Sequence, residues 1–196
     1  MRSLLKRWEQ LPQELQNDSV RPYYEALSRK RGQLLFKRVF DILLSLVLLV
    51  LLSPVMLILA LAIRLDSPGE VLFRQVRVTQ YGQEFRIFKF RTMVANAQQG
   101  DMRITRVGKL LRKCRLDELP QLLNILMGQM SFVGTRPEVP RYVRQYTPQM
   151  LATLLLPAGV TSQASIRYKD EDRLLDSSAD PDRTYVEQVL PGKMEY

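Results

Sequence analysis

The chain has 196 residues, 46% of them hydrophobic, which is enough for one core domain with appendages. It contains no histidine and one cysteine, Cys114, which excludes Ser-His-Asp and Cys-His nucleophile systems, histidine-containing zinc sites and an internal disulfide. Residues 1–116 carry 21 Lys+Arg against 9 Asp+Glu, and this basic balance favours a phosphate-bearing partner: nucleic acid, an anionic membrane surface or a nucleotide.

The first 36 residues contain scattered basic residues and, among their aromatic residues, Trp8, Tyr23 and Tyr24. We expect two short surface or interfacial helices there, without a chemical role. The next segment, residues 39–63, is almost continuously apolar. As a helix it would reach about 37 Å, which is enough for a bilayer core of about 30 Å, so we expect membrane insertion.

Three features of the apolar segment favour a bent helix that enters and leaves the membrane by the same face. Both flanks are basic, with Lys37 and Arg38 before the segment and Arg64 after it, which disfavours translocation of the N-terminal tail. Pro54 lacks an N–H and can bend a helix, and the Ser53 hydroxyl can bond a backbone carbonyl that the bend frees. A kinked helix that spans the bilayer is the alternative.

Residues 71–78 and 84–93, separated by "TQYGQ", are predicted to form a hairpin. Five cations fall on it: Arg74, Arg77, Arg86, Lys89 and Arg91. They are compatible with a solvated strand face, and also with binding of a phosphate-rich ligand.

Asp117 and Glu118 begin an apolar stripe with three-four spacing that runs from Leu119 to Met130 and predicts an amphipathic helix. Acidic residues at a helix start usually serve only as caps. Here, however, residues 106–115 carry five cations, and carboxylates among concentrated cations suit a metal-assisted phosphate site. Further along, residues 132–140 are expected to be a loop, residues 156–166 a turn leading into a strand, and residues 169–183 a solvated acidic surface.

Several segments together resemble the bacterial sugar transferase family, the monotopic phosphoglycosyl transferases. They are "KRVFDILLSLVLLVLLSP", "FRIFKFRTM", "ITRVGKLLRKCRLDELPQLLNIL", "GQMSFVGTRPE", "GVTSQASIRY" and "VLPGKMEY". The resemblance covers roughly residues 37–196, and "KFRTM" and "LDELPQLLN" are its most specific parts.

The resemblance implies a bacterial enzyme on the cytoplasmic face of the inner membrane. Such an enzyme moves a sugar 1-phosphate from a UDP-sugar to a polyprenyl (undecaprenyl) phosphate and releases UMP, as the first membrane step of exopolysaccharide, O-antigen or glycoprotein glycan assembly. It also implies Mg²⁺ as cofactor and a covalent aspartyl-phosphosugar intermediate. Ser53 and Pro54 would be the break of the re-entrant membrane helix.

The resemblance also assigns roles to individual residues. Asp117 would be the nucleophile, and Glu118 would bind the metal with it. The residues that would bind substrate are Lys89, Arg91, Arg112, Arg136, Pro137 and Glu138.

The expected fold is α/β and mostly helical, with a re-entrant helix-break-helix, a compact catalytic domain with interfacial amphipathic helices, and a small β-hairpin. We expect an N-terminal extension over 1–36, the membrane helix over 37–65 and the catalytic domain over 66–196. The expected partners are the UDP-sugar, polyprenyl phosphate, membrane lipid and, as an option, a second copy of the chain. The alternative function is a non-catalytic membrane adaptor with a basic surface. Nucleic-acid binding is disfavoured because a membrane segment and a carboxylate pair interrupt the basic region.

Overall fold

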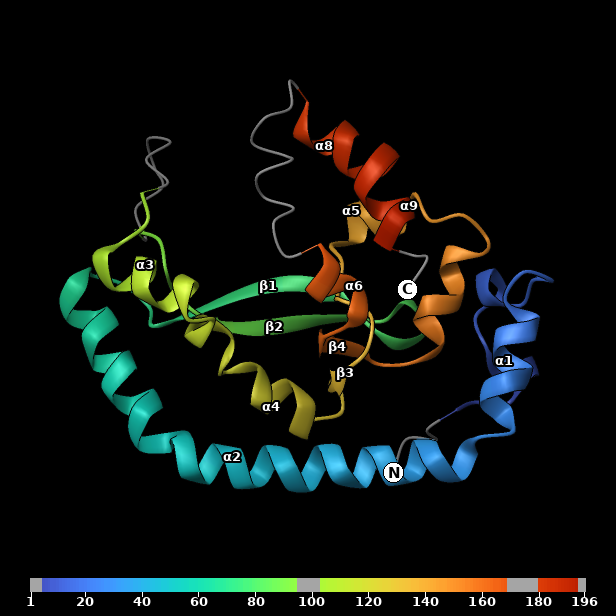
Figure 1. Ribbon diagram of the computed structural model, residues 1–196, viewed down its shortest axis with the longest axis horizontal. Coiled ribbons are helices and arrows are strands. Elements are labelled where there is room, and N and C mark those ends of the chain that lie inside the picture. The colour runs from blue at the N-terminus through green and yellow to red at the C-terminus, as the bar shows by residue number, and fades with distance from the viewer. Residues whose placement is uncertain (1–4, 95–102, 169–179, 194–196) are drawn as a thin grey trace. The chain divides into compact units, whose positions relative to one another are not determined.

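The computed structural model describes residues 5–94, 103–168 and 180–193 (Figure 1). The chain divides into two compact units. The first unit contains Met1–Arg38, Arg77–Phe85 and Gln129–Tyr196, and the second contains Val39–Val76 and Arg86–Gly128. Each unit is described by itself below.

The longest element is the helix α2 (Arg31–Asp66), most of which belongs to the second unit. Its most apolar 18-residue window has a mean hydropathy of 3.1 and is only 6% buried, so α2 is long and apolar enough to cross a membrane and is not a core helix. The apolar side chains that it exposes include Leu43, Val50, Leu51 and Ile58.

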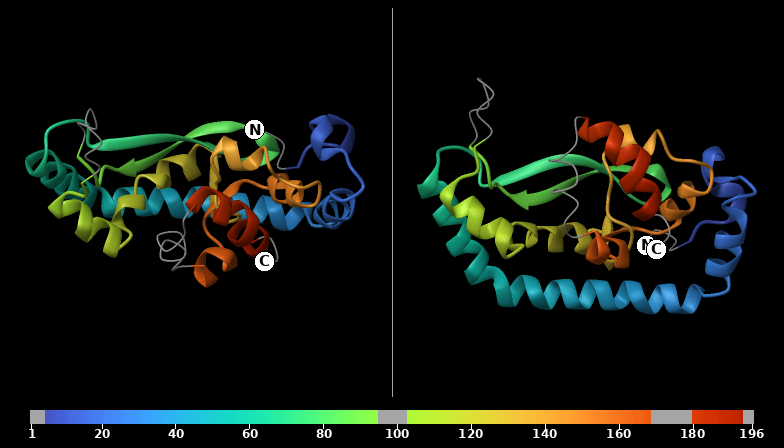
Figure 2. Two further views of the ribbon diagram at one scale, coloured as in Figure 1. Left: turned by 90° about the horizontal axis from the view of Figure 1, so that it is seen from above. Right: turned by 45° about the horizontal axis from the view of Figure 1, so that its top comes forward.

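Pro54 lies inside α2 and removes the N–H that would bond the carbonyl of Val50, four residues earlier. The hydroxyl of Ser53 donates to that carbonyl at 2.8 Å, as the sequence predicted. Figures 1 and 2 show α2 changing direction between its middle and its C-terminal end. The expected break is therefore a bend within one continuous helix.

The predicted hairpin is confirmed as β1 (Leu72–Val78) and β2 (Glu84–Phe90), which pair in a two-stranded sheet. Backbone hydrogen bonds from Thr79 to Gln83 and from Arg91 to Val71 give the antiparallel register. The connection contains the short 3-10 helix η3 (Gln80–Gly82).

The remaining elements of the second unit are α3 (Arg106–Lys113), the 3-10 turn η5 (Leu116–Glu118) and α4 (Gln121–Leu126). Apolar side chains of α3 and of η5 with the residue after it meet α2 and the hairpin around a core of Ile63, Phe90 and Leu111. This core holds the C-terminal end of α2 against the strands and helices that carry the predicted carboxylates.

The predicted helix from Leu119 to Met130 is shorter than expected. Pro120 lacks the N–H that would join η5 to α4, and Gly128 has a φ of 81°, which ends the helical run. Of the predicted stripe, Leu122 is buried in α4 and Met130 lies in β3, whereas Leu123 and Met127 are exposed. The spacing of the apolar residues predicted the helix α4 correctly, but the helix does not continue past Gly128.

The first unit has a parallel strand pair, β3 (Met130–Val133) with β4 (Ala158–Thr161), in which Met130 aligns with Ala158. The strand expected within residues 156–166 is thus confirmed, and α6 (Gln163–Arg167) follows it. The other helices of this unit are η1 (Trp8–Gln10), η2 (Gln13–Leu15), α1 (Arg21–Ser28), α5 (Pro140–Val143), η6 (Met150–Leu155), α8 (Pro181–Thr184), the π-helical turn η7 (Tyr185–Val189) and α9 (Leu190–Lys193).

The main core of the first unit includes apolar side chains from the N-terminal segment. Leu11, Leu15 and Val20 are buried there beside Tyr81 and Leu155. The N-terminal segment does form short helices, but its apolar side chains are part of a packed core. The predicted division into an N-terminal extension, a membrane helix and a catalytic domain, with boundaries after residues 36 and 65, stays a prediction. Most of the expected acidic surface, residues 169–179, lies outside the described residues.

Candidate functional site

The predicted carboxylates lie in η5, the turn between α3 and α4. Arg115, which precedes this turn, has φ 56° and ψ 21°, a left-handed conformation that is uncommon for a residue with a side chain. It ends the right-handed run of α3, so Asp117 and Glu118 start a new helical turn.

Asp117 and Glu118 have different surroundings. Glu118 accepts a hydrogen bond from the Lys89 ammonium at 2.8 Å, and Arg115 lies 3.9 Å from the same carboxylate oxygen. Oδ1 of Asp117 is buried and has no hydrogen-bond partner among the described residues. Burying a carboxylate oxygen without a hydrogen-bond donor lowers the stability of the folded protein. This atom is therefore a candidate for direct contact with a ligand.

Burial raises the pKa of Asp117 above the usual value for an aspartate. The positive charge of Lys89 lowers this pKa, and the negative charge of Glu118 raises it. Lys89 therefore both pairs with Glu118 and favours the ionised form of Asp117.

Asn124, which sequence reasoning missed, joins α4 to the strand that carries Lys89. Its side-chain oxygen accepts from the backbone N–H of Phe88 at 3.0 Å, and its side-chain nitrogen donates to the carbonyl of Arg86 at 2.9 Å. Asn124 is fully buried, and its side-chain amide bonds the backbone of β2 as a neighbouring strand would. An amide in the middle of the apolar run "QLLNIL" was the available signal.

Arg91 occupies a different environment from Lys89. Its two terminal nitrogens donate to the carbonyls of Pro68 and Ser67, both at 2.8 Å, and only 8% of the residue is exposed. In the same turn, Asp66 accepts from the backbone N–H of Val107 at the start of α3 at 2.9 Å. The terminal nitrogens of Arg91 thus hold the turn that follows α2, while its buried Nε has no hydrogen-bond partner among the described residues. The substrate contact of Arg91 stays a prediction.

Arg112 is exposed in the last turn of α3, the helix that precedes the carboxylate turn. Among the described residues, no cluster of three or more His, Cys, Asp or Glu side chains is arranged to hold a metal. Mg²⁺, however, is often held by one or two carboxylates together with substrate phosphates. Oδ1 of Asp117 is available and Glu118 is adjacent, so these residues fit Mg²⁺ bound with a phosphate ligand.

The other predicted substrate residues, Arg136, Pro137 and Glu138, lie in the first unit, in the loop that follows β3. A Cβ on Gly159 would come within 2.1 Å of the backbone nitrogen of Gly134, so these two glycines let the loop and β4 approach closely. Glu138 is buried and accepts from the Tyr185 hydroxyl at 2.5 Å. Tyr185 in turn accepts from Lys193 at 3.1 Å, and neither residue was predicted to take part.

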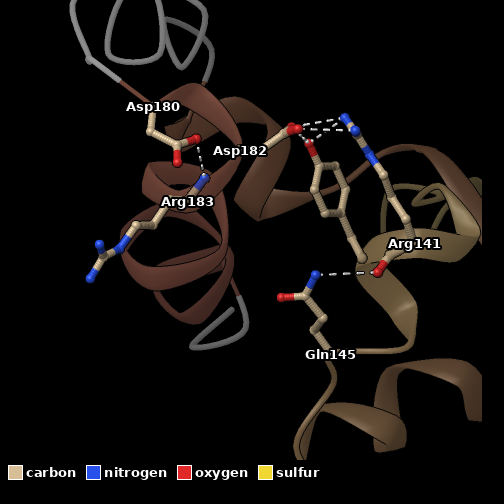
Figure 3. A network of polar contacts seen from close by, with 6 residues as sticks. Arg141, Gln145, Asp180, Asp182 and Arg183 are labelled. Atoms are coloured by element: carbon tan, nitrogen blue, oxygen red, sulfur yellow. Dashed lines mark hydrogen bonds and ion pairs between the residues drawn. The ribbon is translucent and has the colours of Figure 1, made fainter.

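Residues of α5 anchor the C-terminal segment that carries Tyr185 and Lys193. Figure 3 shows Arg141 facing Asp182, with two hydrogen bonds of 3.0 and 2.8 Å. The hydroxyl of Tyr142 donates to the same carboxylate at 2.6 Å, and its ring packs against the ring of Tyr185, with centroids 4.6 Å apart and planes tilted by 34°. The ion pair between Arg141 and Asp182 is exposed, whereas Tyr185 is buried beside Tyr142 of α5.

A sequence profile described as "Bacterial sugar transferase" matches residues 32–191. A UDP-glucose:undecaprenyl-phosphate glucose-1-phosphate transferase of Caulobacter vibrioides is 45% identical over 142 residues, which are 67% of this chain and 53% of that protein. A UDP-N-acetylgalactosamine-undecaprenyl-phosphate N-acetylgalactosaminephosphotransferase of Aeromonas hydrophila is 50% identical over 118 residues, which are 56% of this chain and 28% of that protein.

A UDP-glucose:undecaprenyl-phosphate glucose-1-phosphate transferase of Escherichia coli is 39% identical over 165 residues, which are 79% of this chain and 35% of that protein. The match therefore spans about half or less of the length of these three relatives. The profile, in contrast, covers most of the present chain, including the bent helix, the hairpin, the carboxylate turn and the Arg136 loop. The chain belongs to the bacterial sugar transferase family.

Proposed function

We propose that the protein is a phosphoglycosyl transferase that moves a sugar 1-phosphate from a UDP-sugar to a polyprenyl phosphate and releases UMP. The observation that carries this proposal is the buried, unpartnered Oδ1 of Asp117 beside the Lys89–Glu118 pair. The names of the relatives, which state UDP-sugar donors and undecaprenyl phosphate, support the choice of substrates.

Asp117 is the nucleophile in this proposal. Its carboxylate oxygen attacks the β-phosphorus of the donor, a new O–P bond forms, and the bond from that phosphorus to the bridging oxygen breaks, so that UMP leaves with the electron pair. An oxygen of the polyprenyl phosphate then attacks the same phosphorus, and the bond to Asp117 breaks and restores the carboxylate. Both nucleophiles are anions, so neither step needs a histidine base.

The cations and Glu118 have supporting roles. Lys89 favours the ionised form of Asp117 and orients Glu118 through their 2.8 Å contact. Arg112 and Arg136 are proposed to bind phosphate oxygens of the substrates. Mg²⁺ bound by Asp117 and Glu118 would neutralise charge on the donor diphosphate.

The helix α2 is proposed to enter and leave the membrane by the cytoplasmic face of the bacterial inner membrane. Basic residues flank it on both sides, and the carbonyl of Val50, which Pro54 deprives of its helical donor, accepts from Ser53 instead. This arrangement keeps the carboxylates on the side where nucleotide sugars are found.

The first test is UMP release by the purified protein in nanodiscs that contain undecaprenyl phosphate, with Mg²⁺ and a panel including UDP-glucose and UDP-N-acetylgalactosamine. We expect wild type to release UMP and Asp117→Asn to lose activity by roughly a thousandfold or more, because the amide is not a nucleophile. Glu70→Gln, which changes an exposed carboxylate of the same unit, is the control and should retain activity. Undiminished release by Asp117→Asn would refute the role of Asp117, and no release by wild type would favour the adaptor.

A further inference from the structure

A buried polar chain links the C-terminal segment to the loop that carries Arg136. Glu138, Tyr185 and Lys193 are 7%, 6% and 9% exposed, and all three belong to the first unit. A lysine ammonium only donates and a carboxylate only accepts. The Tyr185 hydroxyl must therefore accept from Lys193 at 3.1 Å and donate to Glu138 at 2.5 Å.

The same loop is fixed through its backbone on both sides of Arg136. The N–H of Gly134 donates to Thr161 at 3.0 Å, and the carbonyl of Thr135 accepts from Gly159 at 2.8 Å. Beyond Arg136, the carbonyl of Pro137 accepts from the Arg77 guanidinium at 3.2 Å. The carbonyl of Glu138 accepts from the N–H of Val78 at 2.9 Å.

Arg136 itself is half-buried and makes no hydrogen bond or ion pair within the described part of the chain. It lies close enough to Arg77 for their like charges to repel, since Arg136 contributes to a lowered pKa of Arg77, after burial as the main cause. Arg77 of β1 and Arg136 of the loop therefore carry neighbouring like charges, and the negative charge of Glu138 offsets the effect of burial on Arg77 by raising its pKa.

We propose that Tyr185 and Lys193 are positioning residues that act through Glu138 to hold Arg136 where it binds the donor diphosphate. This inference rests on the proposed transferase function and deepens it. The chain of hydrogen bonds fixes the Glu138 carboxylate two residues after Arg136. Its bond to Tyr185 and its charge near Arg77 keep Glu138 engaged, so that Arg136, which has no partner among the described residues, binds the substrate phosphate.

The first test is a comparison of donor KM and kcat for wild type and Tyr185→Phe, which removes only the hydroxyl. We expect the donor KM to rise about tenfold, the change that loss of one hydrogen bond to a charged group produces, with kcat within about twofold of wild type. Glu187→Gln is the matched control, because Glu187 lies in the same helical turn and its ion pair with Arg183 is exposed. An unchanged donor KM in a folded Tyr185→Phe protein would overturn the inference.

A double-mutant cycle separates positioning from a general structural role. In an Arg136→Gln background, Tyr185→Phe should change the donor KM by less than about twofold, because the group that it positions is already absent. Additive losses would overturn the inference. Lys193→Met should raise the donor KM in the same way as Tyr185→Phe, and Lys193→Arg should restore part of the loss, since it keeps the charge.

Hydrogen exchange of the backbone amides of residues 134–136, 138 and 139, on either side of Pro137, tests the inference without turnover. Tyr185→Phe should raise their exchange at least about tenfold, while Glu187→Gln leaves it unchanged. If wild type releases no UMP, the transferase proposal fails, and the exchange data still decide whether Tyr185 holds the loop. If Tyr185→Phe does not fold, Lys193→Met is measured instead, and unchanged exchange there overturns the inference.

Discussion

Asp117 and Glu118 are neighbours in the chain but have different electrostatic surroundings. Lys89 bonds Glu118 directly, while one oxygen of Asp117 is buried and finds no donor in the part of the chain that the structure describes. Burial therefore raises the pKa of Asp117, and the positive charge of Lys89 opposes this rise. A nucleophile with a raised pKa loses activity at a higher pH than an ordinary aspartate when the solution is acidified.

The pH dependence of kcat/KM should report this balance. Wild type should lose activity on the acid side as the pH falls through the raised pKa of Asp117, that is, above the ordinary value of 3.8. Lys89→Met removes the charge that lowers this pKa, so its acid limb should move to higher pH. The measurement is UMP release against pH at fixed ionic strength and Mg²⁺.

Lys113→Met provides the comparison for this pH experiment, because Lys113 is an exposed lysine at the end of α3. We expect its acid limb to coincide with that of wild type. If the acid limb of kcat/KM for Lys89→Met falls at the same pH as that of wild type, Lys89 does not control the ionisation of Asp117, even if the substitution lowers the rate.

At the scale of elements, the turn after α2 is held from two sides. Arg91, at the end of β2, bonds the carbonyls of Ser67 and Pro68, and Asp66 bonds the N–H of Val107 at the start of α3. These contacts connect the C-terminal end of α2 to the strand with Lys89 and to the helix that precedes the carboxylate turn. Arg91 thus has a structural explanation that the sequence alone did not suggest.

Replacing Arg91 should therefore reduce stability. Arg91→Gln leaves two carbonyls of the turn without their donors, and we expect the free energy of unfolding to fall by about 3 kcal/mol. Chemical denaturation of the protein in detergent measures this change. Arg86→Gln, which alters an exposed arginine of the same strand, should change the free energy of unfolding by no more than about 0.5 kcal/mol.

The two variants also distinguish the structural role from the substrate contact that the family resemblance implied. If Arg91→Gln has the same free energy of unfolding as Arg86→Gln but a much higher donor KM, Arg91 is a substrate ligand and the turn does not depend on it. A loss of stability with a normal donor KM at low temperature supports the structural role.

At the scale of the whole molecule, the proposed membrane arrangement follows from the basic flanks and the bend of α2. If α2 is re-entrant, residues before and after it lie on the same side of the membrane. The single native cysteine, Cys114, is exposed and follows α2 in the chain, so it reports one side without any substitution.

Labelling with a membrane-impermeant maleimide tests this topology. We expect native Cys114 and, in a Cys114→Ser background, Arg29→Cys to be labelled in inside-out vesicles and protected in intact spheroplasts. Leu51→Cys, placed in the apolar part of α2, should be protected in both preparations. Labelling of Arg29→Cys and Cys114 from opposite sides would mean that α2 spans the bilayer.

The sequence by itself determined the features that depend on neighbouring residues. Alternation and turn residues located the hairpin to within a few positions, and the Ser53-Pro54 pair indicated both the bend and its satisfied carbonyl. The apolar run located α2, although the stripe after Asp117 was extended beyond Gly128. Such patterns arise from short-range periodicity and backbone sterics, which are visible in the order of residues.

Only the tertiary structure decided which polar groups meet. Lys89 bonds Glu118 and leaves an oxygen of Asp117 unpartnered, Arg91 bonds a backbone turn, and Tyr185 reaches Glu138 across 47 positions of the chain. Lys89 and Arg91 carry the same charge, so the sequence alone could not distinguish their roles. Their roles differ because hydrogen bonds form at about 3 Å between groups that packing brings together, and packing depends on residues far apart in the chain.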